Sequence, residues 1–441
     1  APAIETGLWP LPAARVSAET SSLHARSFCR YCFSGSAASI EPSKITRRLN
    51  CLPHYVNREK MHIAIVRRHC SLKKGGAERY CVNLFRGLQK LGHRVTIVGE
   101  AIDDELKEEV DFIPVPVLRL NSWTKNKSFF VNTGRVLRKH RFDVVHGLSR
   151  VDGLDTFRLT ERLQIHWVNM YYRNPVARWL QHMNPRHRLV FDLERKIFGP
   201  DGVRKVIVQS QLDARLLREY FGVDESRICQ IINGVDTNTF HPGVRTDRDA
   251  LREEWKIGRD DPLLVFASMD FRGKGLDSIL DAMARMKNRE TRLIVVGQGN
   301  VGAFERRAKS LGIAHRVTFA GRQSAIQRFY GAADLFVLPT IYEPFPNVNL
   351  EAMACGTPVI TTATAGGSEI IREEANGYLI PNAWDIDALA ERIDHHLGLP
   401  ETRKQAMFDA CWDTASRLRI VDNAQKVAEM FESVVRSKAA A

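Results

Sequence analysis

Two carboxylates lie eight residues apart near the C-terminal end of the chain, at Glu343 and Glu351. The segment around them predicts a short helix, because Pro346 suits a first helical turn and Gly356 suits the position just past the last one. Glu343 would then lie at the mouth of the helix, with Glu351 about two turns further in. One carboxylate could accept hydrogen bonds from the hydroxyls of a sugar and the other from a ribose, while the helix start between them faces a diphosphate. This block therefore predicts a nucleotide-sugar site.

A pair of glycines, Gly75 and Gly76, stands between the first apolar strand and the helix that follows it. Glycines let a backbone approach a ligand closely, and the start of a helix favours an anion. Taken alone, a plain tight turn explains such a pair about as well. The pair is not part of a G-x-G-x-x-G fingerprint, which disfavours a nicotinamide-dependent dehydrogenase.

Two cations, Arg272 and Lys274, follow a later strand and precede a helix. Such cations neutralise a departing diphosphate, although a solvated pair of loop charges is the ordinary alternative. Gly297 and Arg322 follow the next two strands of the same series. We expect these loops to lie on one edge of a sheet, where backbone groups could grip a nucleobase.

Short apolar runs alternate with amphipathic helical stretches from Met61 onward, which predicts an α/β protein with parallel sheets covered on both faces. The expected strands form two series, at residues 61–66, 94–98, 142–146 and 205–209, and at residues 262–268, 292–296, 316–320, 334–338 and 358–361. Ligands of doubly wound sheets bind beyond the carboxyl ends of the strands. Two such domains that face each other would therefore hold the site in a cleft between them.

The expected domain organisation has four parts. Residues 1–60 form an unstructured N-terminal extension, 61–235 an acceptor-side Rossmann-like domain, 236–414 a nucleotide-sugar-binding Rossmann-like domain, and 415–441 a C-terminal helix that crosses back to the first domain. A zinc knuckle from Cys29-x2-Cys32 and Cys51-x2-His54 is an alternative for the extension. Stray cysteines in an unstructured segment are favoured over it, because little apolar sequence surrounds them.

The composition is that of an ordinary globular chain, with 441 residues, 44% apolar and 26% charged. The net charge of +13 predicts attraction to an anionic partner without choosing among nucleic acid, a membrane surface and a phosphorylated substrate. No apolar run approaches the length of about 18 residues that a membrane span needs, and no secretory leader is recognisable. We expect a cytoplasmic protein, with reduced thiols at its scattered cysteines, Cys70, Cys81, Cys229, Cys355 and Cys411.

Taken together, these segments resemble the retaining glycosyltransferases of the GT-B fold, in the large family four. The resemblance covers residues 61–435 and depends on the combination and order of its motifs, which are Gly75-Gly76-Ala77-Glu78, Asp143-Val144-Val145-His146, Asn233-Gly234-Val235-Asp236, Lys274-Gly275, Ala333-Asp334-Leu335 and the block from Glu343 to Val359. Within the family the chain is similar to the type that glucosylates the lipopolysaccharide core, through Gly153-Leu154-Asp155 and the basic stretch from Arg186 to Phe198.

The resemblance implies roles for particular residues. Glu351 would hold the ribose, Glu343 the hydroxyls of the donor sugar, and Lys274 with Arg272 the diphosphate. The donor-binding residues expected in full are Gly75, Gly76, Arg272, Lys274, Gly297, Arg322, Glu343, Asn347, Val348 and Glu351. The residues expected to serve catalysis are Glu343, Lys274, Arg272 and, as alternatives for one polar position on the acceptor side, Glu161 and His166, with Glu161 slightly preferred.

The chain departs from the family pattern at two places. The usual Arg-Lys-Gly appears as Arg272-Gly273-Lys274-Gly275, so the arginine matches less closely than the lysine. Pro346 stands where many members have glycine and has no amide proton, so hydrogen bonds to phosphate must come from neighbours such as Asn347.

The resemblance further implies transfer with retention of the anomeric configuration, and it requires no cofactor besides the nucleotide-sugar co-substrate. No Asp-x-Asp pair is placed to hold a magnesium-bound diphosphate, which favours a metal-independent site. The working hypothesis is a front-face displacement in which the leaving phosphate helps to deprotonate the acceptor hydroxyl.

A basic and aromatic stretch in the first domain could lie on an anionic membrane surface, and a solvated helix is the plainer alternative. Its residues are Arg173, Arg178, Trp179, Arg186, His187, Arg188, Arg195, Lys196 and Phe198.

The preferred function is transfer of a hexosyl unit, from UDP-glucose or a similar UDP-sugar, to a lipid-linked saccharide such as lipopolysaccharide core. This would take place in the cytoplasm, at the inner face of the plasma membrane. The alternative enzyme uses a GDP- or UDP-sugar and a capsule, exopolysaccharide or glycolipid acceptor. A non-catalytic nucleotide or nucleic-acid binder is disfavoured, because such a protein has no need of the carboxylate pair beside Lys274, and no nucleic-acid partner is expected.

Overall fold

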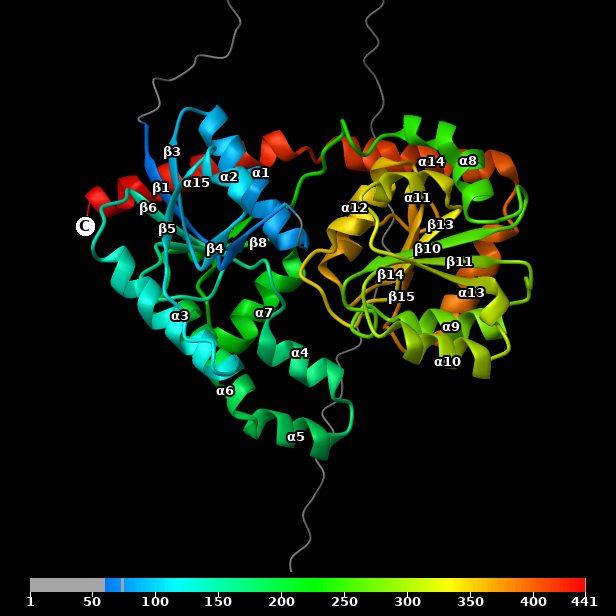
Figure 1. The fold of residues 1–441 in the computed structure, drawn as a ribbon, viewed down its shortest axis with the longest axis horizontal. Coiled ribbons are helices and arrows are strands. Elements are labelled where there is room, and N and C mark those ends of the chain that lie inside the picture. The colour runs from blue at the N-terminus through cyan, green and yellow to red at the C-terminus, as the bar shows by residue number, and fades with distance from the viewer. Residues whose placement is uncertain (1–59, 73–74, 441) are drawn as a thin grey trace, which may run out of the picture. The chain divides into compact units, whose positions relative to one another are not determined.

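The computed structural model describes residues 60–72 and 75–440. The cysteine and histidine residues of the candidate zinc knuckle lie outside these residues, as does the rest of the expected extension up to residue 59. The described chain contains two large parallel sheets and the helices that cover them (Figure 1). The α/β fold expected from the alternating pattern is thus present.

The first sheet has seven parallel strands in the order β5-β3-β1-β6-β7-β8-β9. Their bounds are β1 (His62–Val66), β3 (Arg94–Gly99), β5 (Asp111–Pro114), β6 (Val144–Gly147), β7 (Thr156–Arg158), β8 (Lys205–Val208) and β9 (Ile228–Gln230), and a separate two-stranded sheet pairs β2 (His69–Cys70) with β4 (Ala101–Ile102). The four expected strands are confirmed with small shifts at their ends, such as that at Phe142, which precedes β6. Side chains on both faces of β1 are buried, as a sheet covered by helices on both sides requires.

Seven α-helices lie between β1 and β9 in the described chain. They are α1 (Gly76–Lys90), α2 (Asp104–Lys107), α3 (Ser122–Leu137), α4 (Gln164–Tyr171), α5 (Pro175–Met183), α6 (Pro185–Phe198) and α7 (Gln211–Phe221), with a 3-10 turn η2 (Glu225–Arg227). Helix α1 begins immediately after its N-cap residue, Gly75, and buries Val82, Leu84, Phe85 and Leu88, as its apolar spacing predicts.

The second sheet has six parallel strands in the order β12-β11-β10-β13-β14-β15. Their bounds are β10 (Leu263–Ser268), β11 (Arg292–Gly297), β12 (Val317–Gly321), β13 (Leu335–Leu338), β14 (Val359–Thr362) and β15 (Gly377–Ile380). The helices around it are α8 (Arg248–Glu254), α9 (Leu276–Arg285), α10 (Val301–Ser310), α11 (Ile326–Ala332), α12 (Asn347–Ala354), α13 (Ile386–Leu397) and α14 (Glu401–Ser416), with 3-10 turns η3 (Pro242–Asp247), η4 (Ala314–Arg316) and η5 (Gly366–Ile370). The five expected strands of this series are confirmed.

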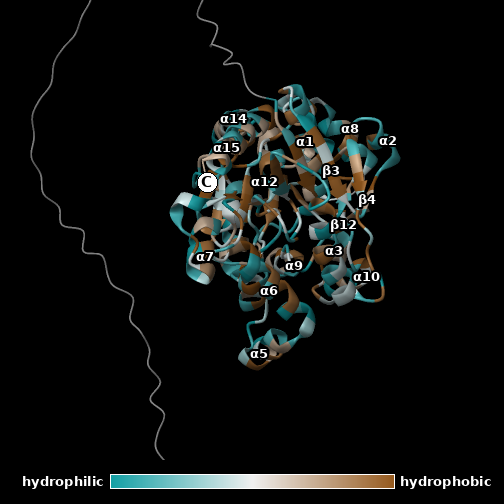
Figure 2. Ribbon diagram, turned by 90° about the vertical axis from the view of Figure 1, so that its left-hand side faces the viewer, coloured by the Kyte–Doolittle hydropathy of each residue, from teal (hydrophilic) through white to brown (hydrophobic). Residues whose placement is uncertain are grey.

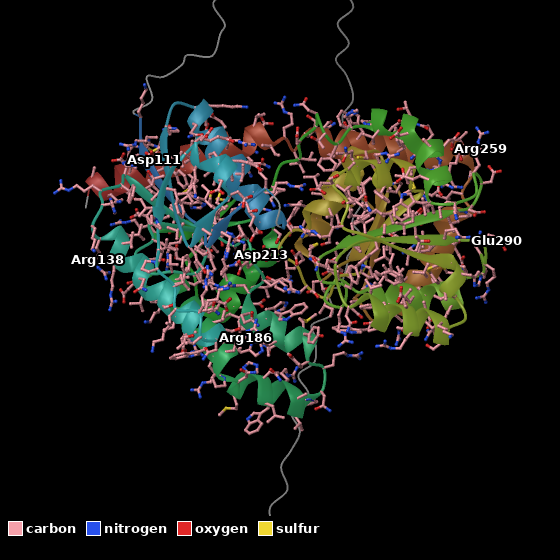
Figure 3. All side chains as sticks on the ribbon, in the orientation of Figure 1. Asp111, Arg138, Arg186, Asp213, Arg259 and Glu290 are labelled. Carbon is pink, nitrogen blue, oxygen red and sulfur yellow. The ribbon has the colours of Figure 1, made fainter. Side chains whose placement is uncertain are left out.

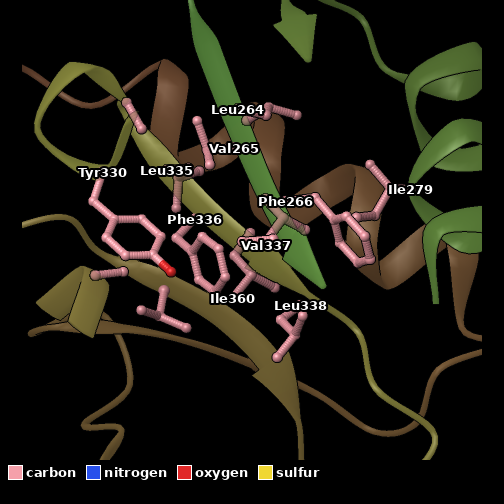
Figure 4. Packing of buried hydrophobic residues seen from close by; sticks show 14 of the residues in the cluster. Leu264, Val265, Phe266, Ile279, Tyr330, Leu335, Phe336, Val337, Leu338 and Ile360 are labelled. Atoms are coloured by element: carbon pink, nitrogen blue, oxygen red, sulfur yellow. The ribbon is translucent and has the colours of Figure 1, made fainter. Parts of the chain in front are cut away.

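The core of the second domain is a stack of buried aliphatic and aromatic side chains from its central strands (Figure 4). Tyr330 of α11 packs against Phe336 of β13 with a centroid distance of 5.3 Å in an edge-to-face arrangement. Both side chains are fully buried. The strand ends that carry the candidate site are therefore held by a rigid, close-packed base.

The last two helices differ from the single C-terminal helix expected over residues 415–441. Helix α14 ends at Ser416, and α15 (Ile420–Ala439) begins three residues after its C-cap, Arg417. Helix α15 packs beside α1, where Tyr80 donates a hydrogen bond to Oδ1 of Asn423 at 3.1 Å (Figure 1). The chain thus returns to the first domain at its C-terminal end.

Two chain segments connect the domains side by side. The amide of Val235 donates to the carbonyl of Leu418 at 2.7 Å, and Val235 forms a parallel bridge with Arg419. A Cβ atom at Gly234 would lie 2.3 Å from the carbonyl carbon of Arg419, so only glycine allows the two segments to approach this closely.

Candidate functional site

Lys274 and Glu343 form an ion pair at the carboxyl edge of the second sheet. Lys274 follows β10, Glu343 follows β13, and Nζ of Lys274 lies 2.5 Å from Oε2 of Glu343. Their side chains are 15% and 23% exposed, so the pair is sheltered but reachable. Burial lowers the pKa of Lys274, because the charge of Glu343 only partly offsets the loss of water around the ammonium group.

The second carboxylate, Glu351, lies on α12 beneath the same edge. Its Oε2 accepts a hydrogen bond from the hydroxyl of Tyr330 at 3.3 Å. Burial raises the pKa of Glu351, and the nearby charge of Arg79 and the bond from Tyr330 act against that rise. Because Arg79 belongs to α1, the first domain contributes a cation to this side of the site.

The starts of two helices meet between these carboxylates. Helix α12 begins at Asn347 after its N-cap residue, Pro346, and a Cβ atom at Gly76 of α1 would lie 3.5 Å from Nδ2 of Asn347. Nδ2 of Asn233 donates to Oδ1 of Asn347 at 2.5 Å across the two domains. The first turn of each helix carries amide groups without partners inside the helix, so both starts favour an anion at this place.

The remaining expected donor-site residues lie on the loops around this edge. Val348 is partly buried and packs against the core of the second domain. Gly297 ends β11 with φ at +125°, and a Cβ atom there would lie 1.7 Å from the carbonyl oxygen of Ser268, so a side chain is excluded. Arg322 is exposed in the loop after β12.

Arg272 is the expected cation that the structure leaves outside the ion pair. Its side chain is 68% exposed and its Nε lies 3.8 Å from Asp277, on the following helix. The arginine that approaches Lys274 is instead Arg162 of the first domain, whose Nη1 donates to Oδ2 of Asp270 at 3.1 Å. The inserted Gly273 explains the difference, because it separates Arg272 from the lysine by one extra residue.

The two alternatives for the acceptor-side residue occupy different surroundings. Glu161 accepts hydrogen bonds from Arg67 at 3.1 Å and from Arg150 at 2.9 Å, and its side chain is 50% exposed. Burial would raise the pKa of Glu161, but the two arginines outweigh that effect and lower it, so this carboxylate is charged.

His166 on α4 is a neutral imidazole. Its Nδ1 lies 3.2 Å from the hydroxyl of Tyr220, and its ring packs edge to face on Tyr342 at 4.6 Å. Burial, with a smaller contribution from Arg215, lowers the pKa of His166 to about 4. His166 therefore contacts the residue that directly precedes Glu343, while Glu161 directly precedes Arg162.

Sequence reasoning missed the residues that join the two domains here, namely Arg79, Arg162, Asn233 and Asp270. Asn233 stands in a motif that the sequence does show, but its partner on the other domain is visible only in the fold. Arg162 adjoins the candidate Glu161, which is the signal that could have pointed to it. Arg79 follows the glycine pair on the first turn of α1.

The fold and the site together define a glycosyltransferase of the GT-B class. Residues 74–239 match the family described as Glycosyltransferase Family 4, and residues 247–407 match Glycosyl transferases group 1. The chain belongs to this family of glycosyltransferases, and the two matches leave only residues 240–246 between them.

Individual relatives support the same assignment. The chain is 24% identical over 324 residues to the lipopolysaccharide glucosyltransferase WaaG of Escherichia coli K12, a match that covers 72% of this chain and 84% of WaaG. It is 29% identical over 344 residues to a D-inositol 3-phosphate glycosyltransferase of Xylanimonas cellulosilytica, covering 70% and 81% of the two chains.

Solved structures show the same fold. The crystal structure of WaaG superposes with a TM-score of 0.74 and 22% identity over 84% of this chain and 99% of that one. HepE of Anabaena, solved in complex with UDP-glucose, superposes with a TM-score of 0.65 and 20% identity over 85% and 100% of the two chains.

Proposed function

We propose that the protein transfers a hexosyl unit, with retention of configuration, from UDP-glucose or a similar UDP-sugar to a lipid-linked saccharide such as lipopolysaccharide core. The observation that carries this proposal is the sheltered pair of Lys274 and Glu343 beside the start of α12. The likeness to WaaG supports the acceptor, and the UDP-glucose in the structure of HepE supports the donor.

Each donor-site residue is assigned to bind one part of the nucleotide sugar. Glu351, whose Oε2 already accepts a hydrogen bond from Tyr330, accepts the ribose hydroxyls. Glu343 accepts hydroxyls of the sugar, and Lys274 neutralises the diphosphate with the first-turn amides of α12, those of Asn347 and Val348. The glycine pair of α1 approaches the phosphates from the other domain.

The chemistry follows from where charge develops. Cleavage of the donor builds positive charge on the sugar ring and negative charge on the leaving phosphate, so cations and helix-start amides lower the barrier there. We place Lys274 and Arg162 at the leaving phosphate, which in turn helps to deprotonate the acceptor hydroxyl on the same face. The reaction is proposed to need no metal. Within residues 60–72 and 75–440, no group of three or more His, Cys, Asp and Glu side chains is arranged to hold an ion.

On the acceptor side, both Glu161 and His166 keep a place in the proposal. The charged Glu161 orients Arg67 and Arg150 and leaves half of its side chain open to a saccharide hydroxyl. His166 acts through its contact with Tyr342. Glu161 remains the preferred group to contact the acceptor, because it is the more accessible of the two.

We further propose that α5 rests on an anionic membrane, which would bring the enzyme to a lipid-linked acceptor at the inner face of the plasma membrane. None of its residues is buried, and its exposed apolar side chains are Val176, Trp179, Leu180 and Met183. Arg178 on the same helix and Arg186 and Arg188 at the start of α6 supply cations, each contributing about 1 kcal/mol near anionic lipid. Figure 2 shows the alternation of hydrophobic and hydrophilic residues along α5.

The rest of the basic stretch is engaged elsewhere. Phe198 is fully buried in the first domain, Lys196 lies over the ring of Phe130, and Arg173 lies over Trp384 of the second domain. The proposed membrane surface is therefore restricted to α5 and the first turn of α6. Among the described residues, none of the helices is both long and apolar enough to span a bilayer.

Vesicle binding tests this surface. Replacing Trp179 and Leu180 by serine should reduce binding to vesicles that contain anionic phospholipid by about tenfold or more, because the apolar anchor is lost. The matched control replaces Leu118 and Leu120, which are exposed on a different loop, by serine. Equal binding by the α5 variant and the wild-type protein would contradict the membrane proposal.

The donor and the stereochemistry are tested together. A panel of UDP-, GDP- and ADP-sugars is screened by thermal stabilisation, and the preferred donor is incubated with lipopolysaccharide core lacking its outer sugars. The NMR spectrum of the product should show a retained anomeric configuration, and the rate should survive chelation of divalent ions. An inverted product, or transfer that stops on chelation and returns with a metal ion, would refute the proposed mechanism.

A second acceptor class is favoured by a specific finding. Several relatives are D-inositol 3-phosphate glycosyltransferases, and one of them is 29% identical over 344 residues. A different glycan or a phosphorylated polyol in place of lipopolysaccharide core would keep the donor site unchanged. Product formation with such an acceptor and none with the core saccharide would decide for this alternative, with a GDP- or UDP-sugar as donor.

A further inference from the structure

Tyr342 precedes Glu343 in the second domain, but its side chain belongs to the core of the first. It is fully buried in the cluster that contains Leu163, Phe198 and Val208. The ring of His166 on α4 meets it edge to face at 4.6 Å. The loop that carries the proposed sugar-binding carboxylate is thus inserted into the neighbouring domain by one aromatic residue.

The hydroxyl of Tyr342 has a buried acidic partner. It donates a hydrogen bond to Oδ1 of Asp213 at 3.0 Å (Figure 3 labels Asp213). Asp213 lies on the first turn of α7, where its amide donates to the capping hydroxyl of Ser210 at 3.1 Å, and its side chain has no exposed surface. Oδ2 of Asp213 has no hydrogen-bond partner within the described chain. Burial raises the pKa of Asp213 to about 7, against the hydrogen bonds from Tyr342 and Ser210.

The same loop approaches α7 at a second point. The amide of Gly366 donates to the carbonyl of Glu343 at 2.9 Å, and a Cβ atom at Gly366 would lie 2.4 Å from Oγ of Ser210. Oε1 of Glu369 accepts a hydrogen bond from the amide of Leu212 at 3.0 Å. The backbone of Glu343 is therefore fixed on one side by η5 of its own domain and on the other by the start of α7.

We propose that Tyr342 and Asp213 are positioning residues that place Glu343 against Lys274 only when the two domains are docked. Docking buries the Tyr342 ring and forms its bond to Asp213, and the adjacent carboxylate then takes the orientation in which it meets Lys274 at 2.5 Å. Lys274 itself is carried by the loop after β10, which meets the Tyr342 loop where the amide of Ile341 donates to the carbonyl of Gly273 at 3.2 Å. The acceptor-side domain thereby controls the sugar site of the donor-side domain.

The inference rests on the proposed function, because it assigns the sugar hydroxyls of the donor to Glu343. A positioning role for Tyr342 and Asp213 affects sugar binding and transfer but not nucleotide binding, whereas a purely structural role would affect all of them. In the proposed function, the affinity for the nucleotide alone depends on Glu351, Asn347 and the phosphate cations. The affinity for the sugar part of the donor, and the rate of its transfer, depend on Glu343.

Two conservative variants test the proposal. Tyr342→Phe keeps the ring and removes the hydroxyl, and Asp213→Asn keeps the shape and removes the charge. The control is Tyr378→Phe, which removes a fully buried hydroxyl of the second domain, bonded to Nδ1 of His396 at 3.1 Å. Tyr342→Phe and Tyr378→Phe each lose one buried hydrogen bond, so their stabilities should fall by comparable amounts, whereas Asp213→Asn removes a buried carboxyl and should not lose stability at neutral pH.

We expect Tyr342→Phe and Asp213→Asn to bind UDP within about twofold of the wild-type protein but to lower kcat for transfer by about tenfold. We expect Tyr378→Phe to leave both unchanged. Equal kcat in all four proteins would overturn the proposal, as would a loss of UDP affinity that matches the loss of kcat, because the effect would then be general disorder of the domain interface.

Hydrogen exchange separates this inference from the proposed function. In the wild-type protein the amide of Gly366, which is bonded to Glu343, should exchange slowly, and the two variants should expose it while the amides of β10 stay protected. This holds even if no nucleotide sugar is a substrate, in which case the proposed function fails and the coupling of Tyr342 to the Glu343 loop still stands. Unchanged protection of Gly366 in both variants would refute the coupling.

Discussion

Replacing Lys274 by methionine tests the charge pair at the centre of the site. Nζ of Lys274 and Oε2 of Glu343 are 2.5 Å apart, and the two side chains are 15% and 23% exposed. Breaking a fully buried pair by removing one partner costs about 3 to 5 kcal/mol. Because water reaches both groups in part, we expect a smaller loss of unfolding free energy, about 2 kcal/mol.

The expected loss of activity is larger than the loss of stability explains. Removing one group that stabilises developing negative charge lowers kcat by about 100-fold to 1,000-fold. The matched control is Arg272→Met, which deletes a 68% exposed cation that lies 3.8 Å from Asp277. We expect the control to retain activity within about threefold, because an exposed pair contributes less than about 1 kcal/mol.

A double variant separates the two effects. Adding Glu343→Gln to Lys274→Met removes the unpaired carboxylate, so the unfolding free energy should return towards that of the wild-type protein while kcat stays low. The assays are urea unfolding and transfer from the preferred nucleotide sugar. Two results would refute the reasoning: activity of Lys274→Met within threefold of the wild-type protein, or a loss in Arg272→Met as large as that in Lys274→Met.

Two further variants test other charges of the site. Glu351→Gln should lower the affinity for UDP, measured by calorimetry, by about tenfold. Its thermal stability should not fall, because burial already raises the pKa of this carboxyl. Equal affinity for UDP in Glu351→Gln and in the exposed control Glu290→Gln (Figure 3) would contradict the ribose role. Burial and the facing acids Glu369 and Glu343 raise the folded-state pKa of Asp213 to about 7, so the wild-type protein loses stability as pH rises from about 4 to 7. Asp213→Asn does not titrate there, so its stability relative to the wild-type protein should rise by about 1.4 kcal/mol per pH unit over that interval. Urea unfolding at pH 5 and pH 8 measures this, and parallel pH profiles of the two proteins would show that Asp213 does not titrate as inferred.

The sequence predicted the central strands of both sheets because their side chains are apolar on both faces. Strands β10 and β11 are six residues long and buried along most of their length, so their pattern stands out. It did not predict β5, β7, β9 and β15, which have three or four residues each. Other four-residue strands were predicted, but these four mix their apolar side chains with polar residues, proline or glycine and so do not stand out from loops.

Sequence reasoning placed the C-terminal helix in the right region but missed its interruption. Neither glycine nor proline marks the interval from Arg417 to Arg419. The break arises because Leu418 and Arg419 pair with Val235, which is nearly 200 residues earlier in the chain. A local pattern contains no information about a partner so distant.

For the site, the residue types and their spacing in the sequence predicted which residues of one domain could lie together at the carboxyl edge of its sheet. Lys274 and Glu343 meet as expected because both follow neighbouring strands of one sheet. Arg162 and Asn233 were missed because they reach the site from the other domain. Tyr342 was missed for a related reason, since a buried aromatic residue before Glu343 gives no sign of which core it enters.

The return of α15 to the first domain has a consequence for how the protein is made. Its Val427, Phe431 and Val434 complete the cluster formed by the apolar face of α1, including Phe85. During translation these residues leave the ribosome after the whole second domain has emerged and begun to fold. The domain that is synthesised first is therefore the one that finishes folding second, and its unfilled apolar face is the surface that a nascent-chain chaperone would cover until α15 emerges.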